Sequence, residues 1–171
     1  DIVVNNAGDQ RAADLADTDP DTWHAVLSAN VVGAMELARH ALPHLAHDAG
    51  SVVNVASVEA IDPSAGHGAY AASKAALVQA TRAAALEWGP RGVRVNAVLP
   101  GLIERPGIAE QWPEGVGRWT ANAPLGRMGR GDDVGDACVF LASPLASFVT
   151  GAALAVDGGL SAQIRTRLEG L

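Results

Sequence analysis

The chain has 171 residues, of which 49% are hydrophobic and 18% are charged, and its formal net charge is -7 at pH 7. This composition is typical of one globular domain with a sizeable core and excludes a disordered chain. An acidic surface argues against nucleic acid or an anionic membrane as a partner. Cys138 is the only cysteine, so no disulfide can form within the chain. No apolar run reaches the length of a membrane span and no signal peptide opens the chain, so we expect a cytoplasmic location.

Strand-like and helix-like stretches alternate along the chain. The chain begins inside the first strand-like run, so we expect it to be cut from a longer protein. In chain order the apolar patterns predict a strand over 2–4, a helix from Asp19-Pro20 to about Ala46, a strand over 51–56, a loop over 58–68, an alanine-rich helix over 69–88, a strand over 93–99, a helix from Asp132 through Ala142 and a last strand over 152–156. Such alternation predicts an α/β fold with a parallel sheet.

The stretch over 102–124 is rich in proline and glycine, which predicts a long irregular segment with a short helix around Trp119. Loops of this length are usually functional lids or mobile. Trp112 and Trp119 lie in this lid segment. They either close over an apolar substrate or anchor the lid, and the sequence favours neither.

Tyr70 and Lys74 carry the strongest chemical signal. They lie four residues apart in the alanine-rich helix and therefore share one face. An ammonium near a phenol favours the phenolate and lowers a pKa that starts at about 10, so the phenol can exchange a proton with a carbonyl or alcohol oxygen. The alternative is an exposed helical pair without a chemical function.

Three turns follow predicted strands. Ser57 comes directly after the 51–56 strand, the turn over 5–8 follows the first strand, and Pro100-Gly101 follows the third. In a parallel sheet the carboxyl ends of strands meet beside the ligand-binding crevice. We therefore expect these turns to converge beside the start of the Tyr70 helix.

Several motifs occur together, in order and in register: Asn5-Asn6-Ala7-Gly8, Asn30 within Ser-Ala-Asn-Val-Val-Gly, Ser57, Tyr70-Ala-Ala-Ser-Lys74, Pro100-Gly101 and Val156-Asp157-Gly158-Gly159. Each motif alone is weak, but the set resembles the classical short-chain dehydrogenase/reductase family across essentially the whole chain. Two variants of the family fit less well. Divergent enoyl reductases space the tyrosine and lysine more widely, and extended epimerase-type members have a longer carboxyl-terminal region.

The resemblance implies a role for each residue of the catalytic set. Tyr70 would be the general acid/base, Lys74 would lower its pKa and hold the nicotinamide ribose, and Ser57 would hydrogen-bond the substrate oxygen and the developing alkoxide. Asn30 would hold, through its main chain, a water that links Lys74 to solvent. The implied reaction interconverts a carbonyl and a secondary alcohol by hydride transfer with NAD or NADP. The substrate is left open among 3-oxoacyl thioesters, ketones and sugars or other secondary alcohols.

The resemblance also implies the fold, the cofactor contacts and the assembly. We expect a three-layer Rossmann-like doubly wound parallel sheet. Cofactor contacts are implied for Tyr70 and Lys74 and for the turns and the base of the lid, at Asn6, Ala7, Gly8, Pro100, Gly101 and Ile103. The alanine-rich helix and the last helix and strand would form subunit interfaces, so a homodimer or homotetramer is expected.

The family's first strand, its TGxxxGxG turn and its first helix have no counterpart in this sequence. We therefore expect residues 1–171 to be a single, N-terminally truncated NAD(P)-binding domain, the carboxyl-terminal two-thirds of the fold. The missing part would bind the pyrophosphate and separate NAD from NADP. The strand over 2–4 would become an apolar edge, and the isolated chain is expected to bind cofactor poorly and to be inactive.

Four residues are candidates for contacts with a small-molecule substrate. Glu59 and His67 lie in the loop that would border the substrate, although plain loop structure also explains them. Arg105 stands where the family often has threonine. It either binds a phosphate or an acidic substrate or is a solvated lid arginine. Trp112 either covers the substrate or anchors the lid.

No metal site is expected. His40, His44 and His47 recur at helical spacing, but their only nearby acidic partner is Asp48, which favours a solvated helix face. Two other classes of function stay open: a catalytically silent fragment or pairing subunit that keeps the interface, and a small-molecule binder without turnover. A TGxxxGxG segment ahead of Asp1 in the parent gene would favour the enzyme.

Overall fold

The computed structural model describes residues 1–45 and 50–163. Its four parallel strands form one sheet in the order β1-β2-β3-β4, with bounds β1 (Ile2–Asn5), β2 (Ser51–Val55), β3 (Arg94–Pro100) and β4 (Ala153–Val156). In the parallel register Val4 lies opposite Val53, and Val98 lies opposite Leu154. The parallel α/β sheet that the sequence predicts is confirmed.

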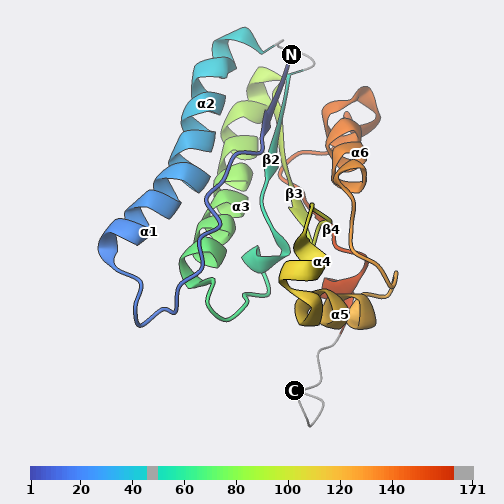
Figure 1. Ribbon diagram of the computed structural model, residues 1–171. Helices are drawn as coiled ribbons and strands as arrows, with labels where there is room; N and C mark the ends of the chain where they lie inside the picture. Colours follow the sequence, from blue (N-terminus) through green and yellow to red (C-terminus); the bar gives the residue numbers. More distant parts are fainter. Residues whose placement is uncertain (46–49, 164–171) are drawn as a thin grey trace.

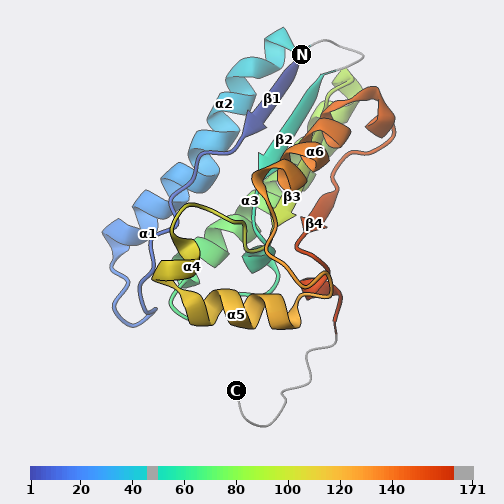
Figure 2. The same cartoon turned by 45° about the vertical axis from the view of Figure 1, so that its right-hand side comes forward.

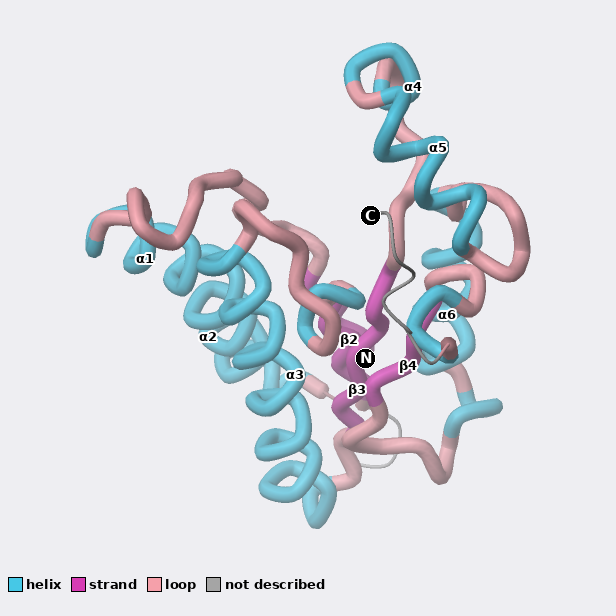
Figure 3. The backbone as a smooth tube through the Cα atoms, turned by 90° about the horizontal axis from the view of Figure 1, so that it is seen from below, coloured by secondary structure: helices cyan, strands magenta, loops and turns pink. Residues whose placement is uncertain are grey.

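Helices cover both faces of the sheet, so the fold has three layers (Figure 1; Figure 2). One face carries α1 (Pro20–Leu27), α2 (Gly33–Ala41) and α3 (Gly68–Trp88), and the other carries α6 (Gly131–Ala142). The lid forms α4 (Ile108–Gln111) and α5 (Pro113–Asn122), near the carboxyl ends of the strands and the first turns of α3. Seen from below, the lid helices and α1 lie on opposite sides of the strand ends (Figure 3).

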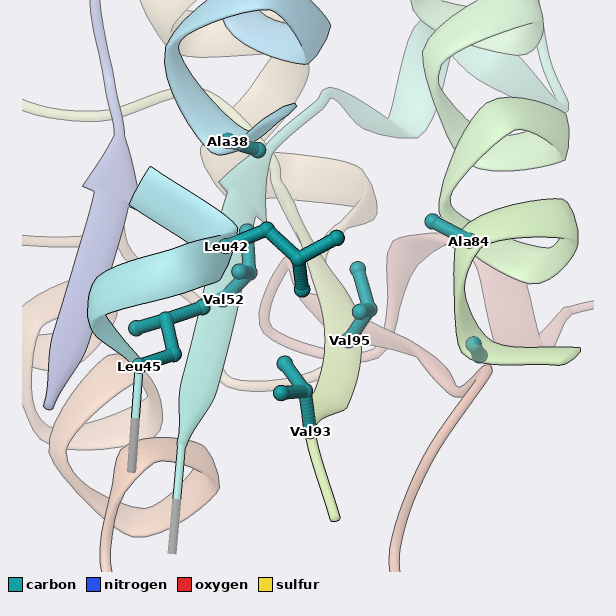
Figure 4. Packing of buried hydrophobic residues seen from close by; sticks show 8 residues of the cluster. Ala38, Leu42, Leu45, Val52, Ala84, Val93 and Val95 are labelled. Carbon is teal, nitrogen blue, oxygen red and sulfur yellow. The ribbon is translucent and has the colours of Figure 1, made fainter. Parts of the chain in front are cut away.

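Side chains of the central strands alternate between two cores. Val52 and Val95 pack with α2 and α3 on one face of the sheet (Figure 4). Val53 and Val98 pack against Leu141 of α6 on the other face. Because both faces are covered, the central strands read as nearly continuous apolar runs rather than as an alternation of polar and apolar residues.

The first predicted helix is interrupted. It begins as expected, with the Asp19 side chain accepting a hydrogen bond from the Thr22 amide at 2.7 Å. A π-helical turn over Ser28–Val32 then separates α1 from α2, and a 3₁₀ turn over Leu42–His44 follows α2. Pro43 in that turn has no N–H to extend the helix. The end of the predicted helix, at Ala46, lies outside the described residues.

The lid is more helical than the sequence predicts. Pro113 opens α5 at a position where no backbone N–H is needed, and Glu114 places a negative charge in the first turn. In the sequence, Gly115 weakens the helical pattern. In the structure, its lack of a side chain allows the chain to pack closely against Trp112. A Cβ at Gly115 would overlap the indole of Trp112.

The lid is closed at its base by an isolated parallel bridge between Ile103 and Gly129. The Glu104 amide donates to the Gly129 carbonyl at 2.8 Å, and the Gly129 amide donates to the Leu102 carbonyl at 2.9 Å. The two ends of the lid therefore lie side by side, next to the end of β3.

β1 is an edge strand of the described sheet, and its α6-facing side is uncovered. Ile2 is 54% exposed and Val4 is 46% exposed. Both border an apolar groove of about 430 Å³ whose opposite wall includes Cys138 and Val139 of α6. The expected apolar edge is therefore present in the part of the chain that the structure describes.

Replacing Arg94 with alanine is expected to lower the free energy of unfolding by about 2–3 kcal/mol, since a hydrogen bond from a charged donor contributes about 1.5–3 kcal/mol. The Arg94 guanidinium donates to the carbonyls of Leu141, Ala142 and Ser143 and so caps the carboxyl end of α6 from β3. Urea denaturation measures the change. Arg91→Ala, at an exposed arginine, is the matched control and should change stability little. Equal losses in the two variants would contradict the capping role.

Candidate active site

Ser57 stands just beyond β2, where the chain leaves the sheet. Its backbone is extended, and its side-chain oxygen accepts a hydrogen bond from the Glu59 amide at 3.1 Å, which caps a 3₁₀ turn over Val58–Ala60. Ser57 is buried. The cap fixes the hydroxyl at the carboxyl end of the strand, on the side of α3.

Tyr70 and Lys74 lie on the first turns of α3 and are both buried. The Lys74 Nζ lies 5.6 Å from the centroid of the Tyr70 ring. It donates a hydrogen bond to the Val55 carbonyl at 2.8 Å, so the last residue of β2 holds the ammonium. The structure therefore brings Tyr70, Lys74 and Ser57 together at one strand end.

The pKa of Tyr70 differs from the expectation. Burial raises the pKa of the phenol, the Ser57 hydroxyl lowers it, and the negative charge of Glu59 raises it further, with a net increase. The expected lowering of the Tyr70 pKa is therefore wrong for this structure, because burial of the phenol has the largest effect. Burial acts on the lysine as well and lowers the pKa of Lys74 to about 8.

The Lys74→Met variant provides a pH test of this burial. Between pH 8 and the usual lysine pKa of about 10.5, Lys74 binds more protons in the unfolded wild-type chain than in the folded chain, so the contribution of Lys74 to wild-type stability rises with pH. The stability of the methionine variant relative to wild type is therefore expected to fall by up to about 3 kcal/mol across this window, since a tenfold change in proton affinity is worth about 1.4 kcal/mol.

Urea unfolding at a series of pH values measures this difference. Lys74 is the only lysine of the chain, so the difference between wild type and the Lys74→Met variant reports the titration of a single lysine. A stability difference that does not change between pH 7 and pH 10.5 would contradict a buried ammonium with a lowered pKa.

Asn30 is buried in the π-helical turn between α1 and α2. Its side-chain oxygen accepts from the Asp9 amide at 2.6 Å, and its amide nitrogen donates to the Asp9 carbonyl at 2.9 Å and to the Ser73 hydroxyl at 2.8 Å. The Ser73 hydroxyl in turn donates to the Tyr70 carbonyl at 2.6 Å. The side chain of Asn30, rather than only its main chain, therefore ties the turn after β1 to the catalytic helix.

Asp9 and Ser73 are thus site residues that the sequence reasoning missed. Ser73 follows Tyr70 by three residues and precedes Lys74 by one, and a polar residue at that helical spacing was the available signal. Asp9 contributes through its backbone, which leaves no side-chain pattern to find.

The turn with Asn6, Ala7 and Gly8 is exposed and lies against the catalytic set. A Cβ at Gly8 would stand 3.1 Å from the Asn30 side-chain oxygen and 3.4 Å from the Lys74 Nζ. Glycine therefore keeps an open, flat surface beside the buried ammonium.

Pro100, Gly101 and Ile103 connect the end of β3 to the lid. The Gly101 amide donates to the Val156 carbonyl at 3.0 Å. The indole of Trp119, from α5, lies on Gly101 where a Cβ would stand. The bridge to Gly129 uses the carbonyl of Leu102 and the amide of Glu104, the two residues that flank Ile103. The N–H and C=O of Ile103 itself take no part in the bridge.

Glu59 and His67 lie close to the catalytic set, whereas Arg105 and Trp112 belong to the lid. The His67 Nδ1 lies 3.0 Å from the Glu59 carboxylate, and the His67 ring meets the Tyr70 ring edge-on at 6.0 Å. Arg105 is exposed on the lid. Trp112 is 49% exposed and its indole rests on Gly115, as expected of a lid anchor.

Within residues 1–45 and 50–163, no group of three or more His, Cys, Asp or Glu side chains is placed to hold a metal ion. The exposed His40 pairs its Nδ1 with the Glu36 carbonyl at 2.8 Å, and His47 and Asp48 lie outside the described residues. In the same part of the chain, no helix has both the length and the apolar character needed to cross a membrane.

Known proteins are similar to this sequence over nearly its whole length. A family sequence profile described as Enoyl-(Acyl carrier protein) reductase matches residues 1–161. Galactitol 2-dehydrogenase (L-tagatose-forming) of Cereibacter sphaeroides is 42% identical over 163 residues, covering 92% of this chain and 64% of that protein. The 3-oxoacyl-acyl-carrier-protein reductase FabG of Thermotoga maritima is also 42% identical over 163 residues, covering 94% of this chain and 65% of that protein. The chain spans just under two thirds of the length of these relatives.

The fold is shared as well. A gluconate 5-dehydrogenase from Burkholderia cenocepacia J2315, solved in complex with NADP and tartrate, superposes with a TM-score of 0.86 at 33% identity and covers 96% of this chain and 66% of that one. The order of the sequence motifs, the three-layer sheet and these similarities all point to the same family. The chain belongs to the short-chain dehydrogenase/reductase family.

Proposed function

We propose that the protein containing this chain is an NAD- or NADP-dependent oxidoreductase that interconverts a carbonyl and a secondary alcohol. The observation that carries the proposal is the meeting of the Ser57 hydroxyl, the Tyr70 phenol and the buried Lys74 ammonium at one strand end. A proton donor, a hydrogen-bonding hydroxyl and a cation in one place suit a reaction in which an oxygen gains charge and then a proton.

The residues present fit the nicotinamide end of such a cofactor. Gly8 leaves an open surface beside Lys74 and Asn30, and the main chain of Ile103 is outside the bridge at the base of the lid. Lys74 would hold the ribose hydroxyls, and the turn over 6–8, Pro100-Gly101 and Ile103 would line the site. The bound cofactor would supply or accept the hydride.

The chain's own residues handle the proton. In the reducing direction Tyr70 would donate its phenolic proton to the carbonyl oxygen, and its raised pKa keeps the phenol protonated at neutral pH. The Ser57 hydroxyl would donate a hydrogen bond to the same oxygen as charge develops on it. Lys74, whose ammonium lies 5.6 Å from the Tyr70 ring centroid, would stabilise the phenolate left behind. Alcohol oxidation reverses these steps.

Similarity to these relatives does not determine the substrate, the oligomeric state or the cellular location of the protein. The two relatives are 42% identical to this chain, yet their names describe a galactitol dehydrogenase and an acyl-carrier-protein reductase. A homodimer or homotetramer stays a prediction, which the exposed apolar side chains of Leu145, Phe148 and Leu154 support. The cytoplasmic location also stays a prediction.

The proposal is tested with the full-length gene product, NADH and NADPH, and a panel of butanone, acetoacetyl-CoA and crotonyl-CoA, with galactitol and NAD or NADP for the reverse reaction. Loss or gain of the absorbance of reduced nicotinamide measures turnover. Turnover of a ketone, a 3-oxoacyl thioester or galactitol supports the proposal. Reduction of crotonyl-CoA alone would indicate an enoyl reductase, the activity in the description of the matching family.

The competing classes of function give other results in the same assay. Cofactor binding without turnover of any substrate would indicate a small-molecule binder. Absence of both binding and turnover would indicate a catalytically silent pairing subunit. The 171-residue chain by itself is expected to bind NADH and NADPH weakly, and tight binding in a titration would contradict that expectation.

A further inference from the structure

Glu59 and His67 form a polar pair beside the catalytic set. The His67 Nδ1 lies 3.0 Å from one carboxylate oxygen of Glu59 and 3.2 Å from the other. The Glu59 side chain is 14% exposed and the His67 side chain is 28% exposed. The pair is therefore neither sealed in the core nor freely solvated.

Each member of the pair is joined to a catalytic residue. The Glu59 amide donates to the Ser57 hydroxyl, so the carboxylate stands two residues past the group that would hold the substrate oxygen. The His67 ring meets the ring of Tyr70 edge-on, with centroids 6.0 Å apart and planes at 74°. The carboxylate also raises the pKa of Tyr70 through its charge, so it lies within electrostatic reach of the reacting proton.

The carboxylate is held in place but not saturated. In the tautomer that suits this contact, the His67 Nδ1 donates a hydrogen bond to it. The Ser64 amide donates to its other oxygen at 3.4 Å. An ionised carboxylate offers about four acceptor positions, so these two donors leave capacity for another.

We propose that the Glu59–His67 pair selects a substrate that carries a hydroxyl group on the carbon next to the reacting carbon. This inference rests on the proposed carbonyl–alcohol chemistry. Glu59 accepts a hydrogen bond from that hydroxyl, and His67 is the positioning residue that keeps the carboxylate oriented. The same negative charge disfavours a substrate that carries a carboxylate at that position.

The test compares three four-carbon carbonyl compounds in the full-length gene product: acetoin, which has the neighbouring hydroxyl, butanone, which lacks it, and acetoacetate, which is anionic. The wild-type kcat/KM is expected to be at least about tenfold higher for acetoin than for butanone, because a site that binds a hydroxyl discriminates against the analogue without it. Acetoacetate is expected to be the poorest of the three.

Three variants separate charge, hydrogen bonding and positioning. Glu59→Leu is expected to bring the kcat/KM for acetoin to within about twofold of that for butanone, since the acceptor is gone. Glu59→Gln keeps an acceptor but removes the charge, so acetoacetate should gain about tenfold in kcat/KM. His67→Phe keeps the ring beside Tyr70 and should lower the acetoin-to-butanone ratio several-fold, mainly through the KM for acetoin.

A changed ratio of the kcat/KM values for acetoin and butanone excludes a merely structural effect, because a distorted site would lower both values together. Glu110→Gln, at an exposed acidic residue of α4, is the matched control and should leave every ratio unchanged. Equal wild-type kcat/KM values for acetoin and butanone, or ratios that Glu59→Leu does not alter, would overturn the selection role. Failure to reduce any carbonyl or oxidise any alcohol would instead overturn the proposed function itself.

Discussion

Replacing Tyr70 with phenylalanine is expected to lower kcat by about 10²–10⁴-fold, the contribution usual for a positioned general acid/base. Only the hydroxyl is removed. The ring that packs edge-on against His67 stays, and so does most of the buried surface of α3. Initial rates with the best carbonyl substrate of the panel, measured in the full-length gene product, provide the test.

The affinity for NADH or NADPH and the free energy of unfolding should change little in this variant, which separates lost chemistry from lost structure. Ser57→Ala is a second comparison, with an expected loss of about 10²-fold, because removal of one hydrogen-bond donor to a developing oxyanion costs about 10²–10³ in kcat. A Tyr70→Phe enzyme with wild-type kcat would rule out Tyr70 as the proton donor.

The Gly101→Ala variant is expected to lose about 1–3 kcal/mol of stability and much of its activity, because overpacking of a filled site costs about 1–3 kcal/mol. A Cβ at Gly101 would overlap the Trp119 indole and stand 3.0 Å from the Asp157 Cα. The indole has to move, and with it the lid helix α5 that stands over the end of β3. Urea denaturation and steady-state kinetics measure the two effects.

Gly117→Ala is the matched control, since it makes the same chemical change in α5 with nothing within 4 Å of the new Cβ. It should be neutral or stabilise by up to about 1 kcal/mol, the difference between alanine and glycine in a helix. Trp119→Phe combined with Gly101→Ala should recover part of the loss. Unchanged stability in Gly101→Ala would show that the indole does not pin the lid there.

The sheet and the position of the catalytic set could be predicted because local sequence determines them. Strong apolar runs mark β2 and β3, and helical spacing places Tyr70 and Lys74 on one face. The carboxyl ends of parallel strands always meet at one edge, so Ser57 could be placed beside α3 without knowledge of any contact.

The parts that could not be predicted depend on long-range packing. A short helix around Trp119 was expected, but α4 and the full length of α5 were not, because Gly115 weakens the helical pattern. Gly115 is needed there because the indole of Trp112 lies against it. The direction of the Tyr70 pKa was wrong because burial depends on the whole fold. The side-chain partners of Asn30 come from two distant segments, at Asp9 and Ser73, which no local pattern joins.

The bridge between Ile103 and Gly129 has a consequence for how such a protein can diverge. The two ends of the lid lie side by side at the bridge, so the segment between them can lengthen, shorten or be exchanged while its base stays in place. A change of ligand preference then needs no compensating change in the scaffold. An exchanged lid must still reproduce the contacts that tie it to the framework, among them an aromatic side chain that fits the bare backbone of Gly101 and the hydrogen bond from the Leu125 amide to the Gly158 carbonyl.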